Sequence, residues 1–427
     1  MATNDFRTSA PPRGEIDGIN LPKPEIFTLD NGIEVYLLSI GTEDMMKVDI
    51  AFEAGKVFEK QPLVSLFTSK CLIEGTKKFK AAEIAERVDF YGAHLNTFNT
   101  ADNAQVSLYC LNKHLGSLLP VMQEVALQPV FPEEEVNTIV AKTREEFLIK
   151  LEKVDFLANQ AFQTLAYGKD HPYCASVVAE DYDNLNSGLL KGFFGQHYFQ
   201  GKIRIVVSGR VPENTDKLLN QYFGAHQVYP QKNQVVVPPG QATLGEHFIL
   251  KENALQSAMQ IGKPFINKLH PDYHKAKIMN TLFGGYFGSR LMTNIREDKG
   301  YTYGIRSVML TMMQSGLFYI TAQVGSEVTQ KAVDEVFYEI KRLQTEPVEQ
   351  EELDLVKNYL MGGFLRSADG PFALAELVKG VAEYNLGMDF YNSYIKTIKT
   401  ITPEEIQHMA VKYLQPDSLI KVVAGKK

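Results

Sequence analysis

An arginine and a tyrosine suited to contacting a peptide stand close together in the segment GGYFGSRLMTNIREDKGYTYG, residues 284–304. Arg296 ends an apolar, helix-like run, and Tyr303 follows a turn at Lys299–Gly300. Gly300 is well placed to end the helix in a left-handed conformation, after which the chain turns back as a strand, so the two side chains can converge. A guanidinium and a phenol suit a peptide carbonyl, a carboxylate or a developing oxyanion. From the residues alone, an ion pair between Arg296 and a neighbouring acid is the simpler interpretation.

The glycines of the same segment do not predict a phosphate site. Gly284, Gly285 and Gly288 lack the spacing of a dinucleotide-binding turn, and no Gly-Lys-Ser/Thr follows them. They favour a tight connection into a short helix.

Histidines and nucleophiles give only weak signals. His270 and His274 stand four apart in HPDYH, which resembles half of a metal site on one helical face. Pro271 is expected to open the helix, however, so a solvated helix start is the better interpretation. His171, in KDHPY, is interpreted as a structural loop histidine, and no Gly-x-Ser-x-Gly motif is present.

The composition is that of a globular protein that does not bind nucleic acid. Hydrophobic residues make up 44% and charged residues 22%, and the net charge of -7 provides no basic face for phosphates. No basic stretch followed by an apolar run begins the chain, and no segment approaches the roughly eighteen apolar residues of a membrane span. Cys71, Cys110 and Cys174 are odd in number and scattered, which suits a reducing compartment. We therefore expect a cytoplasmic protein that does not bind membranes.

Hydrophobic periodicity and turn residues predict a repeated order of strands and helices. In the first half we expect a hairpin around Asp30–Asn31–Gly32, a strand at 46–55, two strands within 94–111, a strand at 202–209, and helices at 80–93, 112–130, 132–154 and 187–197. In the second half we expect strands at 246–251, 257–264, 301–310 and 316–325, and helices from 271, at 329–344 and at 349–365.

The chain is long enough for more than one hydrophobic core, and its halves follow the same order. A strand, a helix, a connector (QPVFPEEEV or TEPVEQEEL) and a second helix occur in both. We predict an α+β protein of two homologous α/β domains in tandem, with mainly antiparallel sheets covered by helices. The predicted units are a flexible arm (1–20), an N-terminal domain (21–223), a polar, Pro-rich linker (224–240) and a C-terminal domain (241–427).

The segment around Arg296 resembles a motif of the pitrilysin/insulinase-like zinc metallopeptidases, the family of the mitochondrial processing peptidase. The family motif reads approximately Leu-Gly-Gly-Gly-x-x-Ser-Arg-Leu-x-x-x-Ile-Arg-Glu-x-x-Gly-Leu-Ala-Tyr. The matching residues are Gly284, Gly285, Ser289, Arg290, Leu291, Ile295, Arg296, Glu297, Gly300 and Tyr303. LDNGIEVYLL, FPEEEV and GKDHPY extend the resemblance over nearly the whole chain. It implies two homologous α+β domains, as the internal repeat also predicts.

The resemblance fails at the zinc motif. Active members carry His-x-x-Glu-His before a Gly-Thr, and counting back from Gly75–Thr76 puts Leu66, Ser69 and Lys70 at those three positions. Glu146 lies 146 − 70 = 76 residues after Lys70, where the family has its third ligand. One carboxylate beside an ammonium does not hold zinc, which needs three or four deprotonated ligands. We expect no metal or cofactor in this chain and no peptidase activity from it alone.

The resemblance also assigns roles to the residues that are retained. Arg296 and Tyr303 match family residues that hold and polarise the substrate backbone, and in some members two chains divide the work. The resemblance therefore implies a zinc-less subunit of a heterodimeric peptidase, with zinc and a His-x-x-Glu-His motif in a homologous partner and a peptide as substrate.

Two alternatives stay open. One is a non-enzymatic scaffold or peptide-binding member of the family. The other, less simple, is a self-sufficient peptidase that uses another site. The resemblance also places Lys70 beside Glu146, which suggests an ion pair at the former zinc position.

Overall fold

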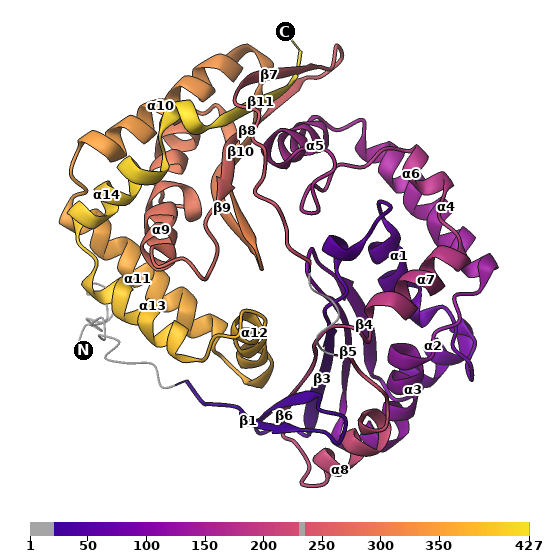
Figure 1. Cartoon of the computed structure of the whole chain (residues 1–427). Helices are drawn as coiled ribbons and strands as arrows, with labels where there is room; N and C mark the ends of the chain where they lie inside the picture. Colours follow the sequence, from indigo (N-terminus) through magenta and orange to yellow (C-terminus); the bar gives the residue numbers. More distant parts are fainter. Residues whose placement is uncertain (1–20, 230–234, 427) are drawn as a thin grey trace, which may run out of the picture.

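Two mixed sheets, each with helices packed on its outer side, make up the protein (Figure 1). The computed structural model describes residues 21–229 and 235–426. We call these two segments the N half and the C half. The expected arm at 1–20 and part of the expected linker lie outside the described residues.

The N half contains a six-stranded sheet in the order β1-β2-β6-β3-β5-β4. Its strands are β1 (Glu25–Thr28), β2 (Glu34–Ser39), β3 (Met45–Phe52), β4 (His94–Asn99), β5 (Ala104–Leu111) and β6 (Ile203–Gly209). Its helices are α1 (Val64–Lys70), α2 (Ala81–Phe90), α3 (Leu115–Leu127), α4 (Glu133–Lys150), α5 (Val154–Tyr167), α6 (Glu180–Asp183), α7 (Ser187–His197) and α8 (Thr215–Leu219). Strands β1 and β2 form the predicted hairpin.

The C half contains a five-stranded sheet in the order β7-β11-β8-β10-β9. Its strands are β7 (Gly245–Leu250), β8 (Gln256–Phe265), β9 (Thr302–Met312), β10 (Ser315–Gly325) and β11 (Ile420–Gly425). Its helices are α9 (Tyr273–Asn280), α10 (Thr329–Thr345), α11 (Gln350–Ser367), α12 (Pro371–Ala382), α13 (Asp389–Thr400) and α14 (Pro403–Tyr413), with π-helical turns η6 (Thr281–Gly285) and η7 (Met292–Asp298).

The internal repeat predicted from the sequence is confirmed by the sheet topology. The sequence β5-α3-α4 in the N half corresponds to β10-α10-α11 in the C half. In both sheets a strand from late in that half of the sequence is inserted between two earlier strands. Strand β6 is parallel to β2 and antiparallel to β3, and β11 is parallel to β7 and antiparallel to β8. The two halves are therefore copies of one α+β plan.

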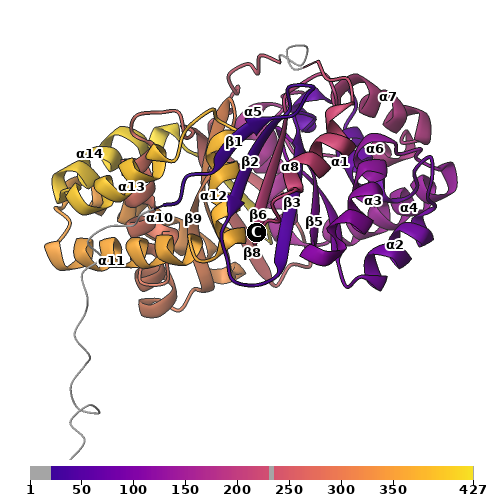
Figure 2. The same ribbon diagram turned by 90° about the horizontal axis from the view of Figure 1, so that it is seen from below.

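Two helices that the sequence did not predict join the halves. Helix α5 packs against β8 and β11 of the other half, where Phe162 shares an apolar cluster with Leu317 and Val422. Helix α12 packs against β2 and β6, and its Val378 shares a cluster with Val206. Figures 1 and 2 show both helices lying between the halves. Each sheet is thus covered partly by a helix from the other half, so neither half is closed by its own residues.

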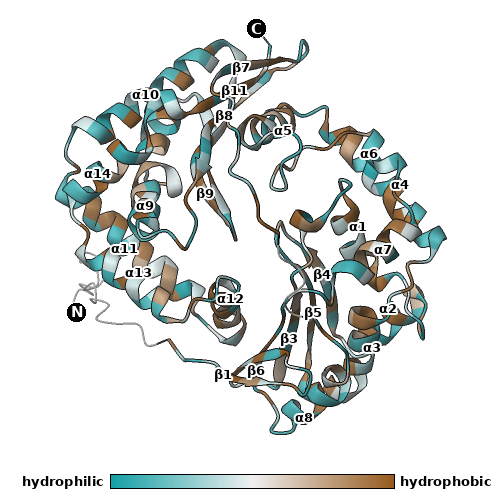
Figure 3. Ribbon diagram, in the orientation of Figure 1, coloured by the Kyte–Doolittle hydropathy of each residue, from teal (hydrophilic) through white to brown (hydrophobic). Residues whose placement is uncertain are grey.

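The outer helices have the apolar stripe expected for packing on a sheet. Helix α10 buries Val333, Val336, Ile340 and Leu343, three or four residues apart. Figure 3 shows the same helix carrying hydrophilic residues as well. All three cysteines are buried and unpaired, and burial raises the pKa of both Cys71 and Cys110 to about 12. No helix in the described parts of the chain is long and apolar enough to cross a membrane.

The contact between α12 and the N-half sheet contains a charge cluster in which Asp49, Lys47 and Lys379 are largely buried and Glu376 is 57% exposed. The carboxylate of Asp49 (1% exposed) lies 3.0 Å from Lys47 Nζ and 2.9 Å from Lys379 Nζ. Glu376 accepts from both lysines at 2.7 Å. Burial opposes the charge on Lys47, but its acidic neighbours outweigh it and raise its pKa. Two positive and two negative groups offset one another, which makes burial of Asp49 and the two lysines tolerable.

The last part of the expected linker is held by residues of both halves. Gln314 accepts from the N–H of Val237 at 2.9 Å and donates to the carbonyl of Val235 at 2.7 Å. The ring of His171 lies at hydrogen-bond distance, 2.8 Å, from the carbonyl of Pro238 and stacks on Tyr167. These contacts give His171 the structural role expected from the sequence.

Candidate functional site

The segment between η6 and β9 is positioned by close backbone packing. A Cβ on Gly284 would lie 2.6 Å from Ser307 Oγ and 2.8 Å from Leu291 Cδ1, so only glycine lets this turn approach β9. Gly300 has φ of 65°, and its N–H donates to the carbonyl of Arg296 at 3.1 Å. The predicted left-handed helix end at Gly300 is confirmed, although the helix itself, η7, is wound as a π-helix.

Arg296 and Tyr303 come from the two sides of this turn. The guanidinium of Arg296 lies 4.5 Å from the ring centre of Phe287. The salt bridges among described residues include none to Arg296, so the simpler interpretation, an ion pair with a neighbouring acid, is wrong. Tyr303 is 94% exposed, and no described residue hydrogen-bonds to its hydroxyl. Both polar groups are therefore available to a ligand.

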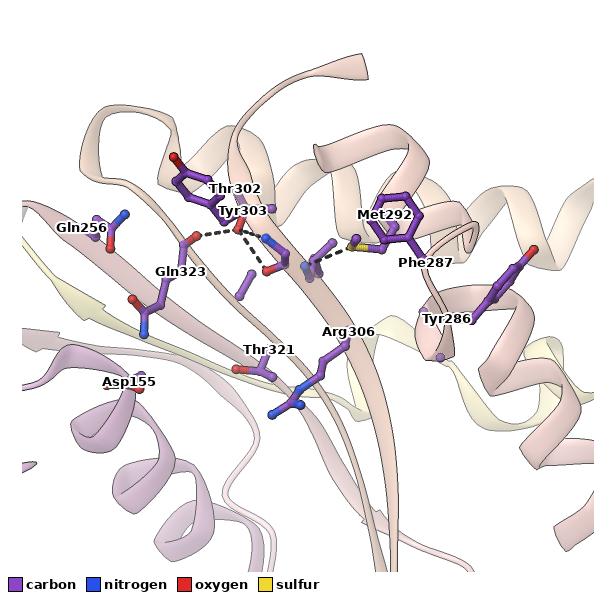
Figure 4. A pocket seen from close by; sticks show the side chains of 15 residues that line it. Asp155, Gln256, Tyr286, Phe287, Met292, Thr302, Tyr303, Arg306, Thr321 and Gln323 are labelled. Atoms are coloured by element: carbon purple, nitrogen blue, oxygen red, sulfur yellow. Dashed lines mark hydrogen bonds between the residues drawn. The ribbon is translucent and has the colours of Figure 1, made fainter. Parts of the chain in front are cut away.

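A pocket of about 600 Å³ lies beside Tyr303, and we call it the Tyr303 pocket. Phe287, Arg306, Gln323 and, from α5 of the N half, Asp155 also line it. Figure 4 shows Tyr303 near the start of β9 and Arg306 further along the strand, with the Arg306 guanidinium on the side of Asp155. The pocket links Arg296 to Tyr303 through Phe287, but no direct contact joins the two predicted residues.

The sequence did not predict Asp155 or Arg306 in this pocket. Asp155 comes from α5, whose crossing to the other half has no local signal. Arg306 does have a sequence signal, since it is the third residue after Tyr303 on a strand predicted at 301–310. Period-two alternation alone would place it on the face opposite Tyr303, but a register shift between Ala322 and Val324 of the paired strand interrupts the alternation over this stretch.

The positions that resemble a zinc motif lie together in the N half. Leu66, Lys70 and Glu146 line one cavity of about 330 Å³ between α1 and α4. Ser69 is buried and donates from Oγ to the carbonyl of Phe98 at 2.9 Å. Leu66 offers an alkyl group, the Ser69 hydroxyl is used in a hydrogen bond, and Lys70 offers an ammonium. Glu146 is then the one carboxylate of the four, so these residues do not fit a zinc ion.

The ion pair expected between Lys70 and Glu146 does not form. Lys70 Nζ lies 3.5 Å from Thr143 Oγ1 instead, and the salt bridges of the described residues do not include Lys70. Glu146 is exposed on α4, so water solvates its carboxylate without a counterion.

His270 and His274 do not form a pair of ligands. His270 Nδ1 accepts from the N–H of Asp272 at 3.1 Å at the start of α9, while His274 packs between Phe390 and Tyr394. Burial, with the nearby charge of Lys277, lowers the pKa of His274 to about 4. The interpretation as a helix start is confirmed for His270, whereas His274 is a half-buried packing residue.

Comparison with known proteins finds matches to peptidase family M16 in both halves of the chain. Residues 35–170 match the insulinase family (peptidase family M16), and residues 184–360 match the domain described as the peptidase M16 inactive domain. The non-peptidase homolog YmxG of Helicobacter pylori is 23% identical over 388 residues, 89% of this chain and 89% of that protein. The beta subunit of the mitochondrial-processing peptidase of Mus musculus is 20% identical over 417 residues, 94% of this chain and 84% of that protein.

A solved structure shows the same fold. The crystal structure of a peptidase M16 inactive domain from Pseudomonas fluorescens superposes with a TM-score of 0.87 at 23% identity, over 95% of this chain and 98% of that one. The resemblance of the sequence to insulinase-like peptidases is thereby confirmed, together with the duplicated α+β fold. The chain belongs to the M16 (insulinase) peptidase family.

Proposed function

We propose that this protein is the zinc-less subunit of a heterodimeric M16 peptidase. In this proposal Arg296 and Tyr303 contact the backbone of a peptide and stabilise the charge that develops on its carbonyl oxygen. Zinc and the general base come from a homologous partner chain. The observation that carries the proposal is that both side chains are open to a ligand while the zinc positions of the same chain carry Leu66, Ser69 and Lys70.

The geometry of the Tyr303 pocket supports contact with a second chain. Tyr303 stands near the start of β9 (Figure 4) and is 94% exposed, so its hydroxyl is accessible to a second chain. The guanidinium of Arg296 lies over the face of the Phe287 ring. Because this contact uses none of its N–H groups in a hydrogen bond, those donors stay available to a ligand. A phenol and a fork of N–H donors are groups that stabilise an oxyanion.

A non-enzymatic, peptide-binding role is the second candidate. One relative is named a non-peptidase homolog, and the donor set at the former zinc position fits that role as well. Under this alternative the protein binds peptides without any zinc-bearing chain.

Purification of the protein from its own cells separates the two candidates. The proposal expects a second chain of similar size, bearing His-x-x-Glu-His, to co-purify in equal amount, and the pair to cleave peptides. Recovery of the protein alone or only with itself, with peptide binding intact, would favour the non-enzymatic role.

A further inference from the structure

A β-bulge interrupts the pairing of β9 with β10 beside Tyr303. The register shifts between Ala322 and Val324 of β10, whose partners on β9 are Ile305 and Thr302. Two residues therefore lie between the paired positions on β9, whereas a single residue lies between them on β10. Two residues opposite one is the arrangement of a β-bulge, which bends the strand and re-aims the side chains beside it.

The bulge accounts for the exposure of Tyr303. Residues directly opposite each other on paired strands lie on the same face of the sheet, and Ile305 lies in the C-half apolar cluster with Ala322 and Val324. In a regular strand residues two apart share a face, so Tyr303 would point into the core beside Ile305. Tyr303 is instead 94% exposed, against 2% for Ile305. The bulge thus turns the phenol out of the core.

The side-chain hydroxyl of Thr302 closes this bulge (Figure 4). Its Oγ1 accepts a hydrogen bond from the N–H of Gly304 at 3.1 Å. Its own proton has two carbonyl acceptors within reach, that of Gln323 on β10 at 2.6 Å and that of Gly304 at 3.0 Å. The hydroxyl therefore joins the two strands and satisfies backbone groups at the point where the bulge disrupts the regular ladder.

The adjacent glycine does not explain the bulge. Gly304 is not among the described glycines with a positive φ, and a Cβ on it would meet no atom beyond its chain neighbours within 4 Å. A conformation that only glycine adopts therefore does not fix the chain here. The bonds of the Thr302 hydroxyl are the contacts that can do so.

We infer that Thr302 is a positioning residue of the peptide site. By closing the bulge, its hydroxyl holds the Tyr303 phenol outside the core, where the phenol can reach a carbonyl of a bound peptide. This inference rests on the proposed function and adds to it a residue that acts through Tyr303 without touching the peptide. A misplacement of about 1 Å can lower a rate about a hundredfold, so a small change in the bulge is sufficient.

Three substitutions separate the hydroxyl from the shape of the side chain. Thr302→Val puts a methyl in place of Oγ1, and a carbon lies about 3.3 Å or more from a carbonyl oxygen, so the 2.6 Å contact with Gln323 cannot persist. Thr302→Ser keeps the hydroxyl. Thr402→Val is the matched control, because the Thr402 hydroxyl also bonds a backbone group, the N–H of Glu405 at 3.3 Å, and Thr402 does not line the Tyr303 pocket.

Nitration by tetranitromethane reports the placement of the phenol in the full-length protein, without a partner or a peptide. Thr302→Val should slow the modification of Tyr303 several-fold, as measured by mass spectrometry, with Tyr338 (54% exposed, on α10) as the internal reference. Thr302→Ser and Thr402→Val should leave the rate at Tyr303 unchanged. Equal rates at Tyr303 in Thr302→Val and in the unmodified protein would overturn the inference.

Turnover of an internally quenched fluorescent peptide by the purified pair tests the consequence for the reaction. Thr302→Val should lower kcat about tenfold or more with little change in KM, because a contact made in the transition state is lost. Thr302→Ser should restore kcat to within about twofold.

A double-mutant cycle shows whether Thr302 acts through Tyr303. In a Tyr303→Phe background, Thr302→Val should lower kcat by less than about twofold, because the hydroxyl that it positions is already absent. A purely structural defect would lower kcat by the same factor in both backgrounds, and that result would overturn the inference.

The outcomes distinguish a failure of the inference from a failure of the proposed function. If Tyr303→Phe lowers kcat and Thr302→Val does not, the proposed function stands and the inference is wrong. If Tyr303→Phe turns over normally, the proposed function is wrong, and the nitration rates alone decide whether Thr302 places the phenol.

Discussion

The guanidinium of Arg296 lies 4.5 Å above the ring of Phe287, which lines the same pocket as Tyr303. Phe287 is 61% exposed, a high value for a phenylalanine that only packs. The ring therefore holds the guanidinium at the edge of the pocket while leaving its donors free.

Replacement of Phe287 by Ala should weaken peptide binding without unfolding the protein. A cation–π contact at an exposed site contributes about 0.5–1 kcal/mol, which corresponds to roughly two- to fivefold in affinity. Peptide titration of Phe287→Ala measures it. The control is Phe90→Ala, which removes an 80% exposed ring from α2, outside the Tyr303 pocket. Equal affinities for the two variants would mean that Phe287 does not position Arg296.

Two substitutions should rebuild a zinc site in the N half. Leu66 and Lys70 share a cavity with Glu146, so Leu66→His and Lys70→His add two imidazoles beside the remaining carboxylate. We expect one zinc ion per chain by elemental analysis, and loss of that ion when Glu146→Gln is added. Ser69 stays unchanged, because its buried hydroxyl is not at a ligand position. Zinc binding that persists after Glu146→Gln would contradict the inferred geometry.

The charge cluster between α12 and the N-half sheet should contribute strongly to stability. Asp49→Asn leaves Lys47 and Lys379 close together with Glu376 as their remaining acid, and breaking such a buried network costs about 3–5 kcal/mol. Asp44→Asn is the matched control, since its ion pair with Arg210 is exposed on both sides and contributes less than about 1 kcal/mol. Urea unfolding measures both. Similar midpoints for the two variants would show that the cluster does not hold the halves together.

His274 should make the protein less stable in mild acid. Its pKa is lowered to about 4 in the folded protein, against 6.5 for the ordinary group. Between these values the unfolded chain takes up a proton that the folded chain does not, so the free energy of unfolding decreases as the pH falls from 6.5 to 4.

His274→Leu should remove that part of the decrease, on the order of 1 kcal/mol once the partial exposure of the ring is allowed for. Thermal unfolding at several pH values checks it against His408→Leu, an exposed histidine on α14. Identical pH profiles for His274→Leu and the unmodified protein would exclude this role.

The sequence predicted the fold better than it predicted the contact between the halves. Local patterns were sufficient for the hairpin at Asp30–Asn31–Gly32, the helix end at Gly300 and the repeated order of elements. Helices α5 and α12 were missed, although Pro371 after Gly370 is a regular helix start. Each helix packs on the sheet of the other half because it covers an apolar face there. Which sheet a helix covers is a property of the two folded halves together, and the sequence of the helix alone does not reveal it.

The candidate site was predicted only in part, for the same reason. Arg296 and Tyr303 were found through a motif, whereas Asp155 reaches the pocket through a contact between distant segments. The expected Lys70–Glu146 ion pair failed because proximity along one cavity wall does not fix where a long side chain ends. A flexible ammonium gains little from an exposed carboxylate.

Turnover by the reconstituted pair tests the central claim most directly. Tyr303→Phe removes one hydroxyl from a side chain that is 94% exposed, so the folded chain and its assembly should be unaffected. Tyr338→Phe removes a hydroxyl from a 54% exposed tyrosine on α10 and serves as the matched control.

With the zinc-bearing partner present in equal amount, the account predicts that Tyr303→Phe lowers kcat about a hundredfold or more, the usual cost of losing a transition-state donor. The control should retain normal turnover, and both variants should elute with the partner as the intact pair. Normal kcat from the assembled Tyr303→Phe pair would contradict the account.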